Sequence, residues 1–200
     1  MNGAGAGTSM TTLAVSQPNA LIRWHYLWYV AAALAIMVAA ILSHDIWFLN
    51  FVHVLAGLMW TGIDLFMGFI VGPILRSVAI SVRREILIRL VPRTLFLMPT
   101  LSAITGTSGW FLAQDLGLTD LPWPQYGWVA AALILIGLMT IQGLGYLLPT
   151  NLRVCFELQK PDPDHARINQ MMRRFFLVVA MQGTMQILII IVMARFVAGI

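Results

Sequence analysis

Five long runs of apolar residues, each close to the length of a membrane-spanning helix, dominate the hydrophobic pattern of this chain. An α-helix rises about 1.5 Å per residue, so about 20 apolar residues cross the hydrocarbon core of a bilayer. The pattern predicts an all-α, polytopic integral membrane protein folded as a bundle of five transmembrane helices. The predicted spans are Leu27 to Ser43, Ile46 to Leu75, Thr94 to Gln114, Tyr126 to Pro149 and Phe175 to Ala194.

Composition and charge agree with a membrane protein and indicate its orientation. Hydrophobic residues make up 60% of the chain, charged residues only 10%, and the mean hydropathy is +0.84, which is too apolar for a soluble domain. Eleven of the twelve Lys and Arg lie before the first span, between the second and third, or between the fourth and fifth. The positive-inside rule therefore places the N-terminus in the cytoplasm and the C-terminus outside. We expect a cell membrane, specifically a bacterial inner membrane, with membrane lipid and no nucleic acid as partners.

The segments outside the spans carry weaker signals. Residues 1–22 are small, polar and uncharged, which predicts a flexible tail before a single transmembrane domain at 23–200. A signal peptide cleaved near Val38-Ala39-Ala40 is a competing interpretation that the uncharged leader disfavours. The segment Arg76 to Arg93 would extend the second helix, lie along the membrane interface or form a solvated loop. The prolines of KPDPDHAR predict a surface turn with a solvated His165.

The second span carries three side chains unusual for a membrane interior. His53, Trp60 and Asp64 are separated by near-integral numbers of helical turns, so they share one stripe of the helix. Ionisable residues inside a membrane are functional by default. Asp64 lies about 16 Å further toward the cytoplasm than His53 by helical rise, so the two cannot contact the same small ligand. The stripe predicts one site in the outer half of the membrane and a second site further in.

Each of these sites has a functional and a structural interpretation. An imidazole in hydrocarbon needs a hydrogen-bond partner or a metal, and neutral imidazole is the commonest protein ligand for iron. His53 is therefore an axial ligand or a histidine bonded to a neighbouring helix, and Gly57 beside it admits a flat ring or a close helix. Asp64 carries a proton, binds a metal ion or pairs with Arg76 or Arg93.

The remaining polar residues of the spans are mostly amides and hydroxyl side chains. We expect the Ser and Thr side chains to support helix packing, because they can bond to the backbone of their own helix. The single cysteine, Cys155, rules out an internal disulfide, and no CxxCH motif for covalent haem is present.

The stretch His53-Val-Leu-Ala-Gly-Leu-Met-Trp60-Thr-Gly62 resembles a conserved helix of small membrane haem-b proteins. These are the relatives of the HemJ protoporphyrinogen oxidase, the CopD copper-resistance membrane domain and the membrane domain of cytochrome-linked urate oxidase. The stretch Arg93 to Gly106 is similar to a second helix of the CopD-like domains. The resemblance implies a haem b whose iron is bound by His53, with Trp60 and Gly57 against the macrocycle. His44 is the histidine closest in depth for a second ligand; methionine, water or a residue from a homodimer are the alternatives.

The leading hypothesis is a membrane-embedded b-type haem protein that transfers electrons or oxidises a porphyrin or quinol substrate. Asp64 would handle the coupled proton, and a redox partner or quinone would complete the reaction. Whether the chain is a haem-dependent oxidoreductase stays open at this point. One alternative is a proton or metal-ion transporter or channel component, in which Asp64, His53 and Gln186 line a path between helices. Another is an accessory subunit of a membrane complex.

Overall fold

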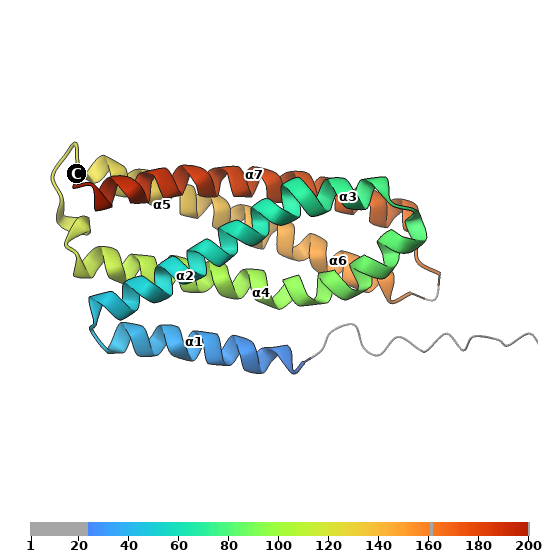
Figure 1. Ribbon diagram of the computed structural model, residues 1–200, viewed down its shortest axis with the longest axis horizontal. Helices are drawn as coiled ribbons and strands as arrows, with labels where there is room; N and C mark the ends of the chain where they lie inside the picture. Colours follow the sequence, from blue (N-terminus) through green and yellow to red (C-terminus); the bar gives the residue numbers. More distant parts are fainter. Residues whose placement is uncertain (1–23, 161, 200) are drawn as a thin grey trace, which may run out of the picture.

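The chain folds as long helices lying side by side. The computed structural model describes residues 24–160 and 162–199, and over these residues it contains helices and no strand, which confirms the all-α class. Four helical rods are long and apolar enough to cross a membrane: Ile46–Ser77, Ile80–Asp115, Tyr126–Leu158 and His165–Val197. A shorter apolar helix, α1 (Tyr26–Leu42), runs beside them (Figure 1). The predicted tail of residues 1–22 lies outside the described residues.

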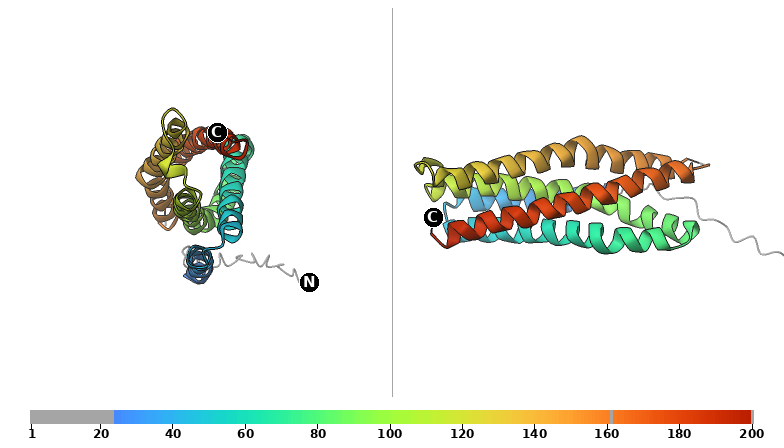
Figure 2. Two further views of the ribbon diagram at one scale, coloured as in Figure 1. Left: turned by 90° about the vertical axis from the view of Figure 1, so that its left-hand side faces the viewer. Right: turned by 90° about the horizontal axis from the view of Figure 1, so that it is seen from above.

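The four rods form two hairpins with the same order of elements. The first consists of α2 (Ile46–Leu65), the π-helical η1 (Phe66–Val71) and α3 (Gly72–Ser77), followed by α4 (Ile80–Asp115). The second consists of α5 (Tyr126–Gln142), the π-helical η3 (Gly143–Leu147) and α6 (Leu148–Leu158), followed by α7 (His165–Val197). The 3-10 turn η2 (Leu118–Asp120) lies in the link between them. Seen end-on, the rods close into a ring with α1 outside it (Figure 2).

Each π-helical segment ends two residues before a proline. Pro73 and Pro149 have no backbone N–H, so an ordinary α-helix would lose a hydrogen bond and clash at each. The amide of Gly72 bonds instead to the carbonyl of Met67, five residues back, and η3 ends in the same way. These wider turns accommodate the prolines, so each rod continues through its proline instead of ending there.

The links between helices correct one expectation and support another. The segment Arg76 to Arg93 neither prolongs the second span nor forms a loop, because the chain turns at residues 78–79 and starts α4 at Ile80. The segment therefore lengthens the helix of the third predicted span. The link from α6 to α7 is a short turn, and His165 is exposed at the first position of α7, as expected.

Side chains of the links fix where the rods begin. Asp45 accepts hydrogen bonds from the amides of Trp47 (2.9 Å) and Phe48 at the start of α2. Asp164 does the same for Arg167 (3.0 Å) at the start of α7. Aspartate is a preferred N-cap because its oxygens satisfy amides that have no partner inside the helix.

The bundle has two different ends. The α3–α4 link and the α6–α7 turn lie at one end, which we call the basic end, and the α1–α2 and α4–α5 links lie at the other (Figure 1). The arginines of residues 76–93 and 160–174 are grouped toward the basic end, whereas Asp45, Asp115 and Asp120 belong to the opposite links. The charge asymmetry inferred from the sequence is therefore an asymmetry of the folded bundle.

Two apolar clusters fill the interior, one toward each end. The cluster at the basic end includes Leu87, Val154 and Phe176, and the cluster at the other end includes Leu49 and Met139. α1 adds Met37 and Ala40 to the second cluster. The outward faces carry large exposed apolar side chains such as Phe69, Ile134 and Ile191, as expected for helices that face lipid. These faces are compatible with a multi-pass membrane protein.

Close contact between the first rod and α7 depends on Gly68. A Cβ built on Gly68 would lie 2.7 Å from the Cα and 2.8 Å from the N of Ala180, and backbone atoms cannot swing aside. We expect Gly68→Ala to lower the free energy of unfolding by about 1–3 kcal/mol, because the helices must separate. Gly62→Ala is the matched control, since nothing lies within 4 Å of its Cβ position. Thermal unfolding of the protein in detergent measures both; equal stability of the two variants would contradict this packing.

Candidate functional site

The predicted stripe of α2 faces two different helices. Figure 1 shows α2 crossing the bundle diagonally, from the α1–α2 link toward α7 at the basic end. His53, near the start of the stripe, contacts α4, whereas Asp64, about 16 Å further along, contacts α7. The two ionisable groups therefore belong to separate sites, as the sequence predicted.

Asp64 is held by two glutamines of α7. Its side chain is almost fully buried, with 2% of its surface exposed. Oδ2 accepts a hydrogen bond from Nε2 of Gln182 (3.0 Å) and another from Nε2 of Gln186 (3.0 Å). The glutamines are four residues apart, so they lie one turn above the other on one face of α7. We call Asp64, Gln182 and Gln186 the carboxylate cluster.

No cation neutralises Asp64 in the described part of the chain. The ion pairs there are Arg89 with Glu85 and Glu157 with Lys160 and Arg167, all near the basic end. The sequence-based alternative of a pair with Arg76 or Arg93 is therefore wrong. A buried carboxylate usually has a cationic or metal partner, so neutral amide partners are an uncommon arrangement.

The carboxylate cluster also contains acceptors that are not used. The Oε1 atoms of Gln182 and Gln186 are both buried and have no hydrogen-bond partner. Buried amide oxygens normally accept a hydrogen bond, and leaving one unsatisfied costs free energy. The Oε1 atoms of Gln182 and Gln186 are therefore acceptors beside Asp64 to which a further N–H or O–H group could donate.

Trp60 completes the surroundings of Asp64. Its indole is 3% exposed and lies one turn before Asp64 on α2. This position places Trp60 in the apolar cluster around Leu49 and Met139 and beside Asp64. A packing role for Trp60 against a haem stays a prediction.

His53 bonds to the backbone of α4. Its Nδ1 lies 3.0 Å from the carbonyl oxygen of Thr105 and 3.3 Å from Oγ of Ser108. A carbonyl oxygen only accepts hydrogen bonds, so Nδ1 carries a proton and donates a hydrogen bond to the carbonyl of Thr105. Nε2 has no hydrogen-bond partner within the described residues, which leaves its lone pair available.

Two glycines at this crossing let α2 and α4 approach. The ring of His53 lies against Gly109, where a Cβ would be 2.6 Å from Cε1. A Cβ built on Gly57 would lie 3.3 Å from the methyl carbon (Cγ2) of Thr105, so α4 packs closely against α2 here. Of the two roles that the sequence allowed for Gly57, the structure therefore favours close helix packing.

The fit of a haem to these residues is partial. The residues supply one axial ligand to iron, because Nδ1 of His53 is hydrogen-bonded to Thr105 and Nε2 has no partner within the described residues. His44 is exposed in the α1–α2 link, with a left-handed φ of 53° that turns the chain there. Among residues 24–160 and 162–199, no three His, Cys, Asp or Glu side chains group as metal ligands.

The hydroxyl side chains of the spans bond mainly to their own helices, as expected. Each donates to a carbonyl three or four residues earlier: Thr100, Ser102, Thr105 and Ser108 in α4, Thr140 in α5 and Thr184 in α7. Hydroxyl groups satisfied in this way are free to face apolar neighbours.

Sequence reasoning found Asp64 but not its partners. Gln182 and Gln186 stood out as polar residues of the last span, and Gln186 as a path residue, but nothing paired them with Asp64. Their spacing of four residues in an apolar helix was the available signal, since it predicts two amides on one face. Gly109 was missed, because a glycine in an apolar helix does not reveal which side chain lies over it.

Comparisons with known proteins found no relative: no family model, no curated protein and no solved structure matches this chain. The resemblance to haem-b membrane proteins therefore stays an expectation from the residues around His53.

The hydrogen bond of His53 predicts its protonation pattern. We expect the ¹⁵N NMR spectrum of histidine-labelled protein to show that Nδ1 of His53 carries a proton. The signal is assigned by its loss in His53→Gln. Gly109→Ala should change this signal because its Cβ would displace the ring, whereas Gly106→Ala has nothing within 4 Å and should not. An unprotonated Nδ1, or the same response to both alanines, would show that the ring does not bond to Thr105.

Proposed function

We propose that this chain is a membrane protein that carries protons through its helical bundle, with Asp64 as the carrier. The proposal includes five transmembrane spans, with the short α1 as the first, the basic end in the cytoplasm and the C-terminus outside. With 17 residues, α1 is at the lower limit of a span. The observation that carries the proposal is a buried carboxylate that has two amide partners and no cation.

The carboxylate cluster is suited to exchanging a proton. An isolated charge in hydrocarbon is costly, and a proton removes that cost. In the charged form Asp64 accepts from the amide nitrogens of Gln182 and Gln186, as observed. In the neutral form its O–H needs an acceptor, and a rotated amide offers the Oε1 atom that is now without a partner. Asp64 would therefore have a hydrogen-bond partner on Gln182 or Gln186 in both its charged and its neutral form.

Polar side chains also occupy other depths of the bundle. His53 and Ser108 lie between Asp64 and the outer end, and Asn151 donates to Oγ1 of Thr94 (3.2 Å) on the side of the basic end. The Oδ1 of Asn151 is buried without a partner. These groups support a route on which protons would reach Asp64 from both sides, with mobile waters between them.

Proton flux in liposomes tests the proposal. We expect the wild-type chain to acidify vesicles when a potassium gradient and valinomycin supply the driving force, and Asp64→Asn to reduce the rate to that of protein-free liposomes. The asparagine keeps the shape and an oxygen that accepts from both glutamines, so folding should be preserved. Asp115→Asn, which changes an exposed carboxylate at the last residue of α4, is the matched control and should keep full flux.

The outcomes separate several possibilities. Equal flux of wild type and Asp64→Asn would refute Asp64 as the carrier. Uptake of ²²Na⁺ that depends on Asp64, without acidification, would replace the proton by a metal ion and support the transporter hypothesis in that form. No flux from correctly folded wild-type protein would refute the carrier function.

A second candidate function is electron transfer through haem b, and the hydrogen bond from His53 to Thr105 favours it. Histidine ligands commonly donate one ring N–H to a backbone carbonyl, which orients the other nitrogen toward a metal. Nε2 of His53 would hold the iron, and the haem would supply one-electron redox chemistry when bound. Asp64 would then accept the proton that is released when a quinol or porphyrin substrate is oxidised.

An absorption spectrum tests this second candidate. We expect protein purified after growth with a haem precursor to show a Soret band that is lost in His53→Ala and retained in His165→Ala, a control that changes an exposed histidine at the start of α7. His44→Ala tests the second ligand predicted from the sequence. Wild-type protein that is folded but has no Soret band would eliminate the haem hypothesis.

A further inference from the structure

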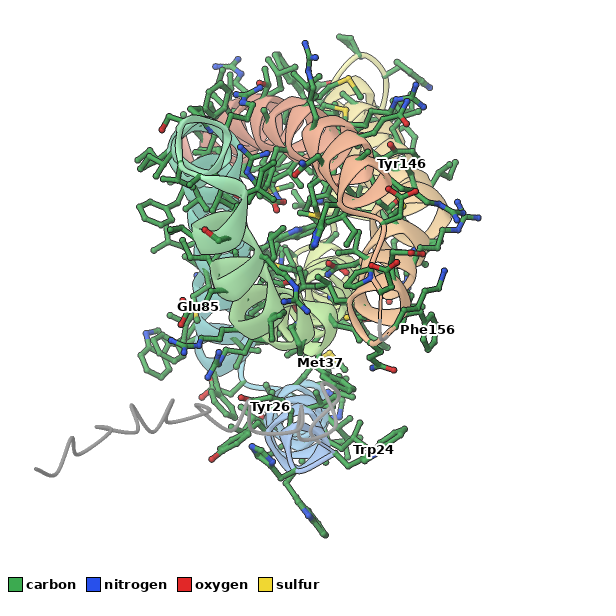
Figure 3. The ribbon with its side chains drawn as sticks, turned by 90° about the vertical axis from the view of Figure 1, so that its right-hand side faces the viewer. Trp24, Tyr26, Met37, Glu85, Tyr146 and Phe156 are labelled. Carbon is green, nitrogen blue, oxygen red and sulfur yellow. The ribbon has the colours of Figure 1, made fainter. Side chains whose placement is uncertain are left out.

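A cavity at the basic end lies apart from the carboxylate cluster. Its volume is about 290 Å³, and it opens between α3, the first turns of α4 and the start of α7. Figure 3 views this end and shows side-chain nitrogen atoms between the helices as well as around the rim. Three of the lining side chains are arginines, Arg76, Arg83 and Arg173. We call this cavity the arginine pocket.

The arginine pocket contains positive charge without a counter-charge. No aspartate or glutamate lines it. The ion pairs of the described residues involve Arg89, Lys160 and Arg167, and none of the three pocket arginines. Three guanidinium groups around one cavity repel one another, and a bound anion would relieve that repulsion.

Arg83 is held in place by the protein itself. Its Nη1 donates to Oδ1 of Asn169 (2.9 Å), and its Nη2 donates to the carbonyls of Arg76 (3.0 Å) and Val78 (3.2 Å). Its Nε is buried and has no partner. A guanidinium with five donors in a rigid fork, of which some are unused, is pre-organised for an oxyanion.

The rest of the wall is apolar. Leu75, Leu87, Met172 and Phe176 line the deeper side of the arginine pocket. A cavity of about 290 Å³ is also larger than a single phosphate or sulfate needs. The combination of guanidinium groups and an apolar wall therefore fits an anion that carries a hydrocarbon part.

We propose that the arginine pocket binds a phosphate group attached to an apolar moiety. The guanidinium groups of Arg83 and Arg173 contact the phosphate oxygens, and Leu87 and Phe176 contact the apolar part. Arginine binds phosphate strongly because its charged N–H groups match two oxygens at once. The phosphate comes from one of two sources, the headgroup of an anionic phospholipid or a soluble phosphate ester. The site is independent of proton transfer at Asp64.

Lipid binding to the full chain tests the proposal. The protein is purified in neutral detergent, mixed with phosphatidylglycerol or phosphatidylcholine, and examined by native mass spectrometry for retained lipid. A second arm adds glycerol 3-phosphate or inorganic phosphate and measures their binding and their competition with the lipid. We expect retention of phosphatidylglycerol and not phosphatidylcholine, and an affinity lowered at least about tenfold in Arg173→Gln.

The choice of variants keeps the result interpretable. Arg83→Gln should weaken binding at least as much, but it also removes three hydrogen bonds that join α3, α4 and α7. The side chain of Arg173 makes no hydrogen bond or ion pair within the described residues, so Arg173→Gln removes no side-chain contact that joins the helices. Arg84→Gln removes the same charge from the neighbouring, exposed position of α4 outside the pocket and should bind like the wild type.

Each outcome decides the proposal. Loss in Arg173→Gln with retention in Arg84→Gln supports the site. Binding of glycerol 3-phosphate at least as tight as that of phosphatidylglycerol identifies a soluble ester as the ligand, whereas weaker binding of the ester identifies the lipid headgroup. Equal weakening by Arg173→Gln and Arg84→Gln would show only general attraction between a basic surface and acidic lipid, and overturns the proposal. Absence of binding in both arms overturns it as well.

Discussion

The buried carboxylate of Asp64 is the constraint around which this bundle is organised. A buried carboxylate must be satisfied by the protein, and its hydrogen-bond partners come from α7. Those hydrogen bonds connect the first hairpin to the last helix of the second. They also separate the two apolar clusters, since Asp64 lies between Trp60 of one cluster and Met67 of the other along the first rod. One polar contact therefore joins the hairpins at the depth where hydrophobic packing changes from one cluster to the next.

Reaching that contact requires the helices to approach closely, and glycines make this possible. Gly68 lies against the backbone of Ala180, and Gly183 lies against Leu65, both close to the carboxylate cluster along their helices. Packing of small residues stabilises helix association in lipid, where burying apolar surface gives little driving force. The same principle operates in the half of the bundle opposite the basic end, where Gly109 accommodates the ring of His53. The two candidate sites thus share a construction, in which a polar side chain of α2 is held by a helix that a glycine allows to come near.

The basic end is built differently from the interior. Its rods extend beyond the length that a bilayer requires, so their ends carry charged residues on helical frames. Glu85 and Glu157 neutralise some of these charges. Within residues 24–160 and 162–199, Arg76, Arg83 and Arg173 have no acidic partner and line one cavity. A positive-inside pattern alone needs no such arrangement, because arginines in a solvated loop would orient the protein equally well. The folded arrangement therefore combines a topological signal with a pocket for an anion.

Hydropathy by itself determined the helical class and located the four long apolar helices, because lipid permits only helices or closed barrels and apolar length is readable residue by residue. The positions of Lys and Arg in the sequence determined the asymmetry of charge. Hydropathy also singled out His53 and Asp64, since ionisable residues are rare in apolar runs. The ends of the rods were less predictable. The segment Arg76 to Arg93 is helical apart from the turn at residues 78–79, and burial of Leu87 and Val91 in the core outweighs the polarity of its arginines. Only the tertiary structure decided which residues form hydrogen bonds with His53 and Asp64. The stripe of α2 meets α4 at His53 and α7 at Asp64 because α2 crosses the bundle at an angle, and a crossing angle arises from the packing of several helices at once, not from the periodicity of one.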